Sequence, residues 1–217
     1  MLELRGLDAW WGPAQVLFQV ALTVQPGELV LLQGLNGAGK SSLLQAIMGL
    51  GPRVRGSVRY QGQDLSASAA DVRARAGLGY VPENRRLFGE LTVQQNLLLA
   101  ARPRQDRVAL QRHLQEVLAM FPALEPALPR LALQLSGGEQ QMLALARTLM
   151  TSPSMLLLDE PCEGIAPVLV ESIREVLLKL KQQGMPMLIA EQNALLVSHA
   201  DRLITLTAGQ LSGANTP

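Results

Sequence analysis

The sequence is poor in aromatic residues, in cysteine and in long apolar runs, and each shortage excludes something. Only 3% of its 217 residues are aromatic, so its core has to be built largely from aliphatic side chains. The single cysteine, Cys162, rules out a disulfide within the chain and is consistent with a reducing compartment. No run approaches the roughly 18 apolar residues of a membrane-spanning helix, so any membrane component has to be another chain.

Charge and the amino terminus exclude two further classes of protein. The net charge of +1 gives no sign of the concentrated basic patch that nucleic-acid binding usually requires, and we expect no nucleic-acid partner. The first residues, Met1–Arg5, lack the charged-then-apolar layout of a secretory signal. We therefore expect a cytoplasmic protein that forms one domain, or one domain with a subdomain.

Short apolar runs alternate with helical segments over most of the chain, which predicts an α/β fold with a mostly parallel sheet flanked by helices. The expected strands are 2–10, 16–24, 28–33, 57–60, 77–81, 155–159, 185–190 and 202–207. The expected helices are 40–50, 92–101, 107–120, 167–183 and 193–200. The first two strands predict an antiparallel part at the amino terminus. Residues 86–146 are expected to form a helical insert, and residues 212–217 a frayed tail.

The segment GLNGAGKS at 34–41 matches the GxxxxGK[ST] phosphate loop. A strand precedes it and a helix follows, so backbone N–H groups and the helix start can face one anion. Lys40 is expected to reach the β- and γ-phosphates of a nucleotide, and Ser41 to bind Mg²⁺. The alternative is a glycine-rich turn without a ligand. The candidate nucleotide ligands here are Gly34, Asn36, Gly37, Ala38, Gly39, Lys40, Ser41 and Ser42.

Two carboxylates, Asp159 and Glu160, follow the apolar run that begins at Met155. Successive strand residues point to opposite faces, so the two carboxylates need not compete for one metal ion. Asp159 is the candidate to hold Mg²⁺ through water, and Glu160 is the candidate base that polarises an attacking water. By itself an Asp-Glu pair is more often a structural carboxylate at a strand end.

The segment LSGGEQQ at 135–141 allows two interpretations. Ser136 and Glu139 form the pattern of a capping box, which is a structural role. Capping does not require two glycines, each of which lowers helix propensity by about 1 kcal/mol. Backbone exposed by Gly137 and Gly138 at a helix start is suited to a phosphate group.

Phosphate loop, LSGGEQQ and Asp-Glu strand end follow one another in the order found in the ATPase subunits of ABC transporters, and the chain resembles them over nearly its whole length. The resemblance implies a P-loop NTPase (RecA-like) fold, ATP with Mg²⁺, and transmembrane permease subunits as partners. It implies that Ser136, Gly137 and Gly138 bind ATP held by a second ATPase subunit, either a copy or a paralogue, in a head-to-tail dimer. It also implies that adenine stacks on Trp11, for which a buried pair with Trp10 is the alternative.

Two positions depart from the common pattern of that family. Glu83 stands where many members have Gln after Val-Pro, and Gln192 stands where the switch His is usual. Glu83 can accept from water or bind Mg²⁺, and Gln192 can still hydrogen-bond a γ-phosphate, so both join Glu160 as catalytic candidates. Together the departures resemble the ATPases of branched-chain amino-acid importers, and Glu-Gly-Ile at 163–165 is similar to those of urea importers.

The sequence thus predicts a peripheral protein at the inner face of the cell membrane that couples ATP hydrolysis to uptake of branched-chain or related amino acids, amides or urea. An extracytoplasmic substrate-binding protein is expected in the same system. Residues 1–217 are expected to form a single ATPase domain, with a nucleotide-binding core at 1–85 and 147–217 and a helical subdomain at 86–146. The alternatives are a soluble ATPase of the same family acting on ribosomes or DNA, and a weakly active regulatory ATP-binding module.

Overall fold

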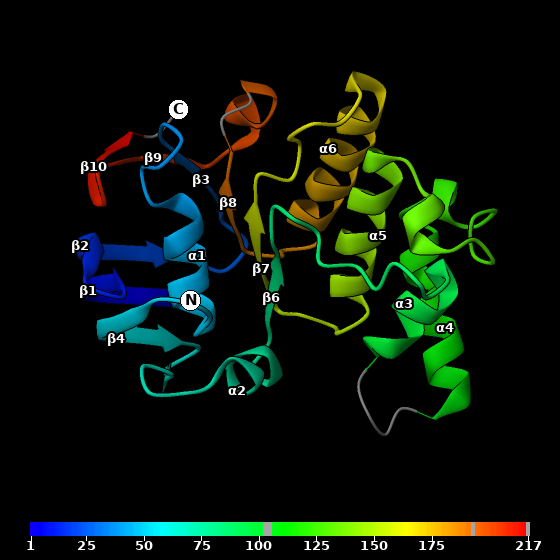
Figure 1. Cartoon of the computed structure of the whole chain (residues 1–217), viewed down its shortest axis with the longest axis horizontal. Helices are drawn as coiled ribbons and strands as arrows, with labels where there is room; N and C mark the ends of the chain where they lie inside the picture. Colours follow the sequence, from blue (N-terminus) through cyan, green and yellow to red (C-terminus); the bar gives the residue numbers. More distant parts are fainter. Residues whose placement is uncertain (102–105, 192–193, 216–217) are drawn as a thin grey trace.

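The structure, a computed structural model, describes residues 1–101, 106–191 and 194–215. The catalytic prediction for Gln192 lies outside these residues. The described chain forms two sheets, and helices pack on both sides of the larger one (Figure 1).

The smaller sheet is antiparallel and has the strand order β2-β1-β4-β5. Its strands are β1 (Leu2–Trp11), β2 (Ala14–Val24), β4 (Arg53–Tyr60) and β5 (Gln63–Asp64). The pairing of β1 with β2 confirms the predicted antiparallel part. β4 begins at Arg53 rather than at the predicted Ser57, because residues 53–55 pair with β1 although arginine dominates their sequence.

The larger sheet has the strand order β10-β9-β3-β8-β7-β6 and is parallel except for β10. Its strands are β3 (Leu29–Gln33), β6 (Leu78–Val81), β7 (Met155–Asp159), β8 (Met187–Ala190), β9 (Arg202–Thr207) and β10 (Gln210–Asn215). The parallel part confirms the predicted fold class. Because parallel strands end at the same edge, the residues that follow β3, β6, β7 and β8 are brought together there.

Helices cover both faces of this sheet (Figure 1). They are α1 (Lys40–Met48), α2 (Ala70–Arg75), α3 (Val93–Leu99), α4 (Arg107–Leu118), α5 (Gly137–Leu149) and α6 (Pro167–Gln182), with 3₁₀ turns at Pro122–Leu124, Ala132–Gln134 and Ala194–His199. α1 packs between the two sheets, whereas α5 and α6 lie on the opposite face of the larger sheet. None of the helices in the described part of the chain has the length and apolar character that crossing a bilayer requires.

Alternate residues of the buried strands belong to two different apolar clusters. In β3, Val30 and Leu32 pack with α1 and the smaller sheet, whereas Leu29 and Leu31 pack with α5 and α6. β7 and β8 alternate in the same way. Burial on both faces explains why these strands are continuous apolar runs.

The predicted helical insert shares its core with the larger sheet. Val93 and Leu97 of α3 and Leu114 of α4 lie in the same apolar cluster as Leu143 of α5 and Leu156 of β7. α5 stands between the other two helices and the sheet, so one continuous apolar layer extends from β7 out to α3 and α4 (Figure 1).

α3 starts at the predicted capping box. Thr92 Oγ1 accepts from the backbone N–H of Gln95 at 3.1 Å, and Gln95 Oε1 accepts from the backbone N–H of Thr92 at 2.8 Å. The two side chains thus satisfy two backbone donors at the helix start, which stabilises this end of α3.

The prediction of a frayed tail is wrong for residues 212–215. β10 pairs antiparallel with β9, and Leu211 lies opposite Leu206. The turn between the strands is formed by Ala208 and Gly209, whose φ values of 46° and 77° are those of a two-residue hairpin. The small residues that follow Leu211 conceal the pairing in the sequence.

Candidate functional site

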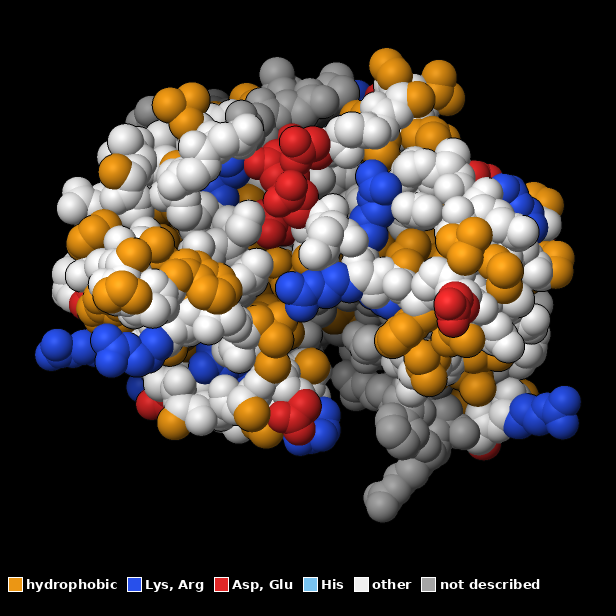
Figure 2. All heavy atoms as spheres, viewed as in Figure 1, with side chains coloured by type: hydrophobic (Ala, Val, Ile, Leu, Met, Phe, Trp, Pro, Cys, Tyr) orange, Lys and Arg blue, Asp and Glu red, His pale blue; other side chains and the backbone are white. Residues whose placement is uncertain are grey.

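A pocket of about 300 Å³ opens where the loop after β3 meets the residues that follow β6 and β7. Three acidic residues line it, Glu83, Glu160 and Glu163. Its other lining residues are Val16, Asn36, Gly37, Gly39, Lys40, Ser41 and Ser42. Figure 2 shows acidic side chains gathered in the hollow at the upper centre of this face, with basic side chains to either side.

The loop between β3 and α1 can take its shape because two of its positions are glycine. A Cβ on Gly34 would lie 2.3 Å from the carbonyl oxygen of Leu206, so only glycine fits this approach to β9. Gly39 is the N-cap of α1 and has a φ of 107°, a left-handed conformation that L side chains rarely adopt. The start of α1 therefore faces the pocket with N–H groups that have no partner within the helix, which favours an anion.

Lys40, the first residue of α1, is buried at the base of this loop. Its Nζ donates to the carbonyl oxygens of Gly34 at 2.8 Å and Leu35 at 3.4 Å, and forms an ion pair with Glu160 Oε1 at 3.0 Å. The ammonium group is thus held at the pocket by the loop and by the residue that follows β7.

Asp159 is buried at the end of β7, and both of its carboxylate oxygens accept hydrogen bonds. Oδ1 accepts from Ser41 Oγ at 2.9 Å, and Oδ2 accepts from the Tyr80 hydroxyl at 3.2 Å. Burial raises the pKa of Asp159 to about 6, although the two hydrogen bonds oppose the shift. The structure therefore brings together Ser41 and Asp159, the two residues predicted to face Mg²⁺ from the loop and from the strand end.

Glu160 has a backbone conformation that sets it apart from Asp159. Its φ of 48° is left-handed, and its backbone N–H donates to the carbonyl oxygen of Ala190 at 2.8 Å. Non-glycine residues with positive φ are uncommon and concentrate at functional sites. The side chain of Glu160 consequently faces Lys40, while that of Asp159 faces Ser41.

The donor atoms at the pocket fit Mg²⁺. Hydroxyl and carboxylate oxygens from Ser41, Asp159 and Glu83 are the hard ligands that Mg²⁺ prefers. Within the described ranges no group of three or more His, Cys, Asp or Glu residues could hold a metal ion alone. This donor set is typical of Mg²⁺ bound through one or two protein oxygens together with phosphate oxygens and water.

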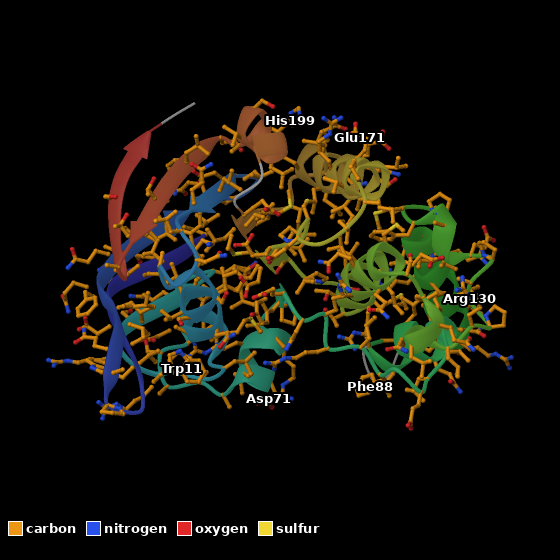
Figure 3. The ribbon with its side chains drawn as sticks, turned by 45° about the horizontal axis from the view of Figure 1, so that its top comes forward. Trp11, Asp71, Phe88, Arg130, Glu171 and His199 are labelled. Carbon is orange, nitrogen blue, oxygen red and sulfur yellow. The ribbon has the colours of Figure 1, made fainter. Side chains whose placement is uncertain are left out.

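Trp11 lies beside α1 at the end of β1 (Figure 3). Its side chain is 45% exposed, and its Nε1 donates to Ser42 Oγ at 3.1 Å. Trp10 instead packs under the guanidinium of Arg53, 5.1 Å from the ring centre. A buried Trp10–Trp11 pair is therefore wrong for Trp11, which is open to a ligand and in contact with the pocket residue Ser42.

The start of α5 is a complete capping box. Ser136 Oγ accepts from the Glu139 backbone N–H at 3.3 Å, and Glu139 Oε2 accepts from the Ser136 backbone N–H at 2.7 Å. Gly138 is buried, and a Cβ there would lie 2.1 Å from Leu169 Cδ1 of α6. The prediction that Gly138 exposes its backbone is thus wrong, because close helix packing already requires that glycine. Ser136 is exposed and Gly137 half-buried, and neither lines the pocket of its own chain.

The loop after β6 connects the pocket to α5. Glu83 lines the pocket, and two residues later Arg85 reaches the first turns of α5. The Arg85 guanidinium donates to Gln141 Oε1 at 3.1 Å and to Gln140 Oε1 at 3.3 Å. A displacement of Glu83 can therefore be transmitted to α5 through the next two residues of the loop.

Arg147, near the carboxyl end of α5, contacts the same loop. It donates to the carbonyl oxygens of Arg85 and Arg86 at 3.1 and 2.9 Å, and its guanidinium lies 5.5 Å from the ring centre of Phe88. Phe88, labelled in Figure 3, is 51% exposed at the end of this loop. Both ends of α5 thus contact the segment that begins at the pocket.

Sequence reasoning missed three residues at the site. Glu163 lines the pocket, and Tyr80 hydrogen-bonds to Asp159. Glu191 is 2% exposed and its Oε2 accepts from the backbone N–H of Cys162 at 3.0 Å. Each of the three lies within a few residues of a motif position. That proximity in the chain is the feature of the sequence from which they could have been predicted.

Known proteins resemble this chain in sequence. The sequence model of the family described as ABC transporter matches residues 17–163. The high-affinity branched-chain amino acid transport ATP-binding protein BraG of Pseudomonas aeruginosa is 39% identical over 212 residues, 97% of this chain and 91% of that protein. The lipopolysaccharide export system ATP-binding protein LptB of Escherichia coli K12 is 34% identical over 219 residues, 100% of this chain and 90% of that protein.

Solved structures resemble it in fold. A dimeric ATP-binding cassette in a post-hydrolysis state, bound to ADP and Pi, has a TM-score of 0.89 and 25% identity, covering 100% of this chain and 98% of that one. A nucleotide-free ATP-binding cassette from an ABC transporter has a TM-score of 0.87 and 26% identity, covering 100% and 91%.

Proposed function

Because the chain belongs to the ABC transporter family and is an ATPase of that family, we propose that it drives uptake of branched-chain amino acids or closely related solutes through separate permease subunits. The observation that carries the catalytic part is that Lys40, Ser41 and Glu160 line one pocket and that Asp159 hydrogen-bonds to Ser41. Lys40 and Ser41 begin α1, and Asp159 and Glu160 lie at the end of β7, more than a hundred positions later in the sequence.

ATP would bind with its phosphates over the loop 34–42. The N–H groups at the start of α1 and the ammonium of Lys40 provide the positive charge for them. Lys40 would exchange its carbonyl and carboxylate partners for phosphate oxygens. Trp11, exposed beside Ser42, is placed to stack on adenine.

Mg²⁺ would be held by Ser41 Oγ and Asp159, with Glu83 at the same pocket. When bound, it neutralises charge on the β- and γ-phosphates. Glu160 would accept a proton from the water whose oxygen attacks the γ-phosphorus, as the bond to the β–γ bridging oxygen breaks and ADP leaves. Gln192, outside the described residues, remains a candidate to hydrogen-bond the γ-phosphate.

Two ATPase subunits would pair head to tail. Ser136 and Gly137 do not line their own pocket, and a partner's ATP would give the exposed start of α5 a ligand. The cassette bound to ADP and Pi that resembles this chain is dimeric. We propose a nucleotide-binding core at 1–85 and 147–217 and a helical subdomain at 86–146 that carries this second contact.

The choice of solute rests on sequence similarity. BraG is described as a branched-chain amino acid transport protein, and LivF of Archaeoglobus fulgidus is described as a probable one. An extracytoplasmic substrate-binding protein would deliver the solute. Reconstitution with the co-purified membrane subunits tests this: ATP-dependent uptake of labelled leucine is the expected result. Release of lipopolysaccharide instead, the activity named for LptB, would overturn the importer proposal.

Removal of the loop lysine tests the nucleotide site directly. Lys40→Ala should lose ATP binding, measured by calorimetry, and ATP hydrolysis. The control is Lys179→Ala, since Lys179 is exposed on α6 and lies outside the lining of this pocket. Unchanged hydrolysis in Lys40→Ala would remove the phosphate-loop assignment.

A further inference from the structure

Tyr80 lies on β6, the strand next to β7, and faces the same side of the sheet as Asp159. In the parallel register Tyr80 is opposite Leu157, two residues before Asp159. Residues two apart on a strand share a face, and Tyr80 and Leu157 both pack in the cluster that contains α1. The long phenol side chain therefore reaches toward the strand end, where its hydroxyl donates to Asp159 Oδ2 at 3.2 Å.

A second side chain faces the same hydroxyl. Burial and Asp159 raise the pKa of Tyr80, whereas Gln45 of α1, which lies close to the hydroxyl, lowers it. Gln45 and Ser41 are four residues apart and so lie on one face of the helix. Asp159 thus hydrogen-bonds directly to Ser41 of α1, and its second donor, Tyr80, lies close to Gln45 of the same helix.

The two hydrogen bonds fix the orientation of the Asp159 carboxylate. Asp159 is 1% exposed, so bulk water does not reach it to replace a missing donor. With Oδ2 held by Tyr80, Oδ1 is turned toward Ser41, the side on which the phosphate loop opens. Without the hydroxyl only the Ser41 hydrogen bond restrains rotation of the carboxylate about its Cβ–Cγ bond.

We propose that Tyr80 is a positioning residue for Asp159, and that its hydroxyl sets the affinity of the site for the divalent cation that accompanies the nucleotide. The inference rests on the proposed function, since it concerns the same pocket. Groups that hydrogen-bond a metal-binding side chain commonly change metal affinity by about 10- to 100-fold. Asp159 would hold the cation partly through water, so we expect an effect near the lower end of that range.

The chain provides a matched control because it contains two tyrosines. Tyr60 of β4 is buried, and its hydroxyl hydrogen-bonds to Ser154 Oγ at 2.8 Å, away from the pocket lining. Tyr60→Phe and Tyr80→Phe therefore both remove a phenol oxygen that hydrogen-bonds to another side chain. They differ in whether that hydrogen bond reaches Asp159.

The test measures Mn²⁺ binding to the full chain saturated with ADP, with electron paramagnetic resonance as the readout. Binding of ADP without metal is measured separately in EDTA. Tyr80→Phe should weaken Mn²⁺ binding about tenfold and leave metal-free ADP binding unchanged, while Tyr60→Phe shifts Mn²⁺ binding less than about twofold. Equal Mn²⁺ affinity in the wild type and Tyr80→Phe, or equal shifts in both variants, would overturn the inference.

A second variant keeps the inference testable if Tyr80→Phe does not fold. Gln45→Met keeps the length of the side chain and removes the amide that faces the Tyr80 hydroxyl. It should weaken Mn²⁺ binding about two- to threefold, less than loss of the hydroxyl itself. Wild-type affinity in Gln45→Met would contradict the proposed arrangement. A wild-type chain that binds no ADP at all would instead overturn the proposed function, so the two failures are distinguishable.

Discussion

Lys40 and Glu160 form an ion pair with 3.0 Å between Nζ and Oε1, and their side chains are 5% and 8% exposed. Each group is one that the proposed reaction needs for another purpose, Lys40 for phosphate and Glu160 for water. A γ-phosphate entering the pocket has to compete with the Glu160 carboxylate for Lys40. Binding of ATP would therefore break the ion pair with Lys40 and make Glu160 available as a base when the γ-phosphate enters the pocket.

Replacing Glu160 with Gln should separate binding from hydrolysis. The amide cannot accept a proton at neutral pH, so hydrolysis should fall by at least about 100-fold. ATP affinity should rise, because no ion pair with Lys40 has to be broken. The steady-state rate of phosphate release and the ATP dissociation constant check the two effects.

Glu163→Gln is the control for that experiment. Glu163 lines the same pocket but is exposed, and we expect its replacement to change the rate less than about threefold, well short of the loss of a general base. If Glu160→Gln kept wild-type turnover, the base would have to be another residue.

Replacing Gly138 with Ala should destabilise the fold. The added Cβ would lie 2.1 Å from Leu169 Cδ1 and 3.1 Å from Leu169 Cβ, so α5 and α6 would have to separate. Overpacking of this kind costs about 1–3 kcal/mol in the free energy of unfolding, which urea denaturation measures. Gly137→Ala is the matched control, since its nearest neighbour would be Arg85 at 3.5 Å, and it should be neutral or stabilising. Equal loss in both variants would contradict the packing argument.

Arg73 of α2 should be among the most costly arginines to remove. It is 1% exposed, and its guanidinium donates to the carbonyl oxygens of Ala46 and Ile47 at the end of α1, at 3.0 and 2.7 Å, and to those of Ser66 and Ser68. Arg73→Met leaves these acceptors without that donor and should lower the free energy of unfolding by about 3 kcal/mol, measured by thermal denaturation.

Arg75→Met is the comparison for Arg73, because Arg75 lies two residues further along α2 and is exposed. It loses only an exposed pair with Asp71 and should cost less than about 1 kcal/mol. Similar melting temperatures for the two variants would show that Arg73 does not anchor the end of α1.

The capping box of α5 should contribute stability that depends on pH. Hydrogen bonding from the Ser136 backbone N–H holds the pKa of Glu139 below its ordinary value. A lowered folded-state pKa means that the contribution is complete above the unfolded-state value of about 4.3 and is lost as pH falls through the folded-state pKa. Glu139→Gln keeps an acceptor but no charge, so it should be less stable than the wild type by up to about 1 kcal/mol at pH 7.

Urea denaturation of Glu139→Gln and the wild type across the pH range measures this contribution. The difference between the two should shrink below about pH 4, as the wild-type carboxylate becomes protonated. A difference that stays constant with pH would mean that the charge of Glu139 does not contribute.

The structural features that the sequence predicted correctly are those that a few neighbouring residues determine. β7 and β9 have the predicted bounds, because an apolar run ending in a turn or a carboxylate defines each of them. The loop between β3 and α1 was also predictable, since its glycines and Lys40 lie close together in the chain. The meeting of Ser41 with Asp159 followed from the parallel sheet, which aligns the ends of β3 and β7.

What the sequence did not reveal depends on contacts between distant elements. The role of Tyr80 requires the register of β6 against β7, and a single aromatic residue in a strand does not encode it. Arg73 looks like a surface residue of a short helix until α1 is placed against it. Gly138 was predicted to be exposed because its own helix is visible in the sequence, whereas Leu169 of the neighbouring helix is not.

The apolar cluster that runs from the larger sheet through α5 into α3 and α4 limits how the helical insert can move. Among the described residues of 86–146 no separate core is set apart from the sheet, because Leu97 and Leu114 belong to the same cluster as Leu156 and Ile189. Any reorientation of the start of α5 therefore has to proceed by sliding side chains past one another within a continuous apolar layer, as shear motions do, rather than by bending at a linker. Each step of such a movement is small. Binding of a partner at the start of α5 and binding of a nucleotide at the start of α1 would therefore be coupled through small displacements of packed side chains.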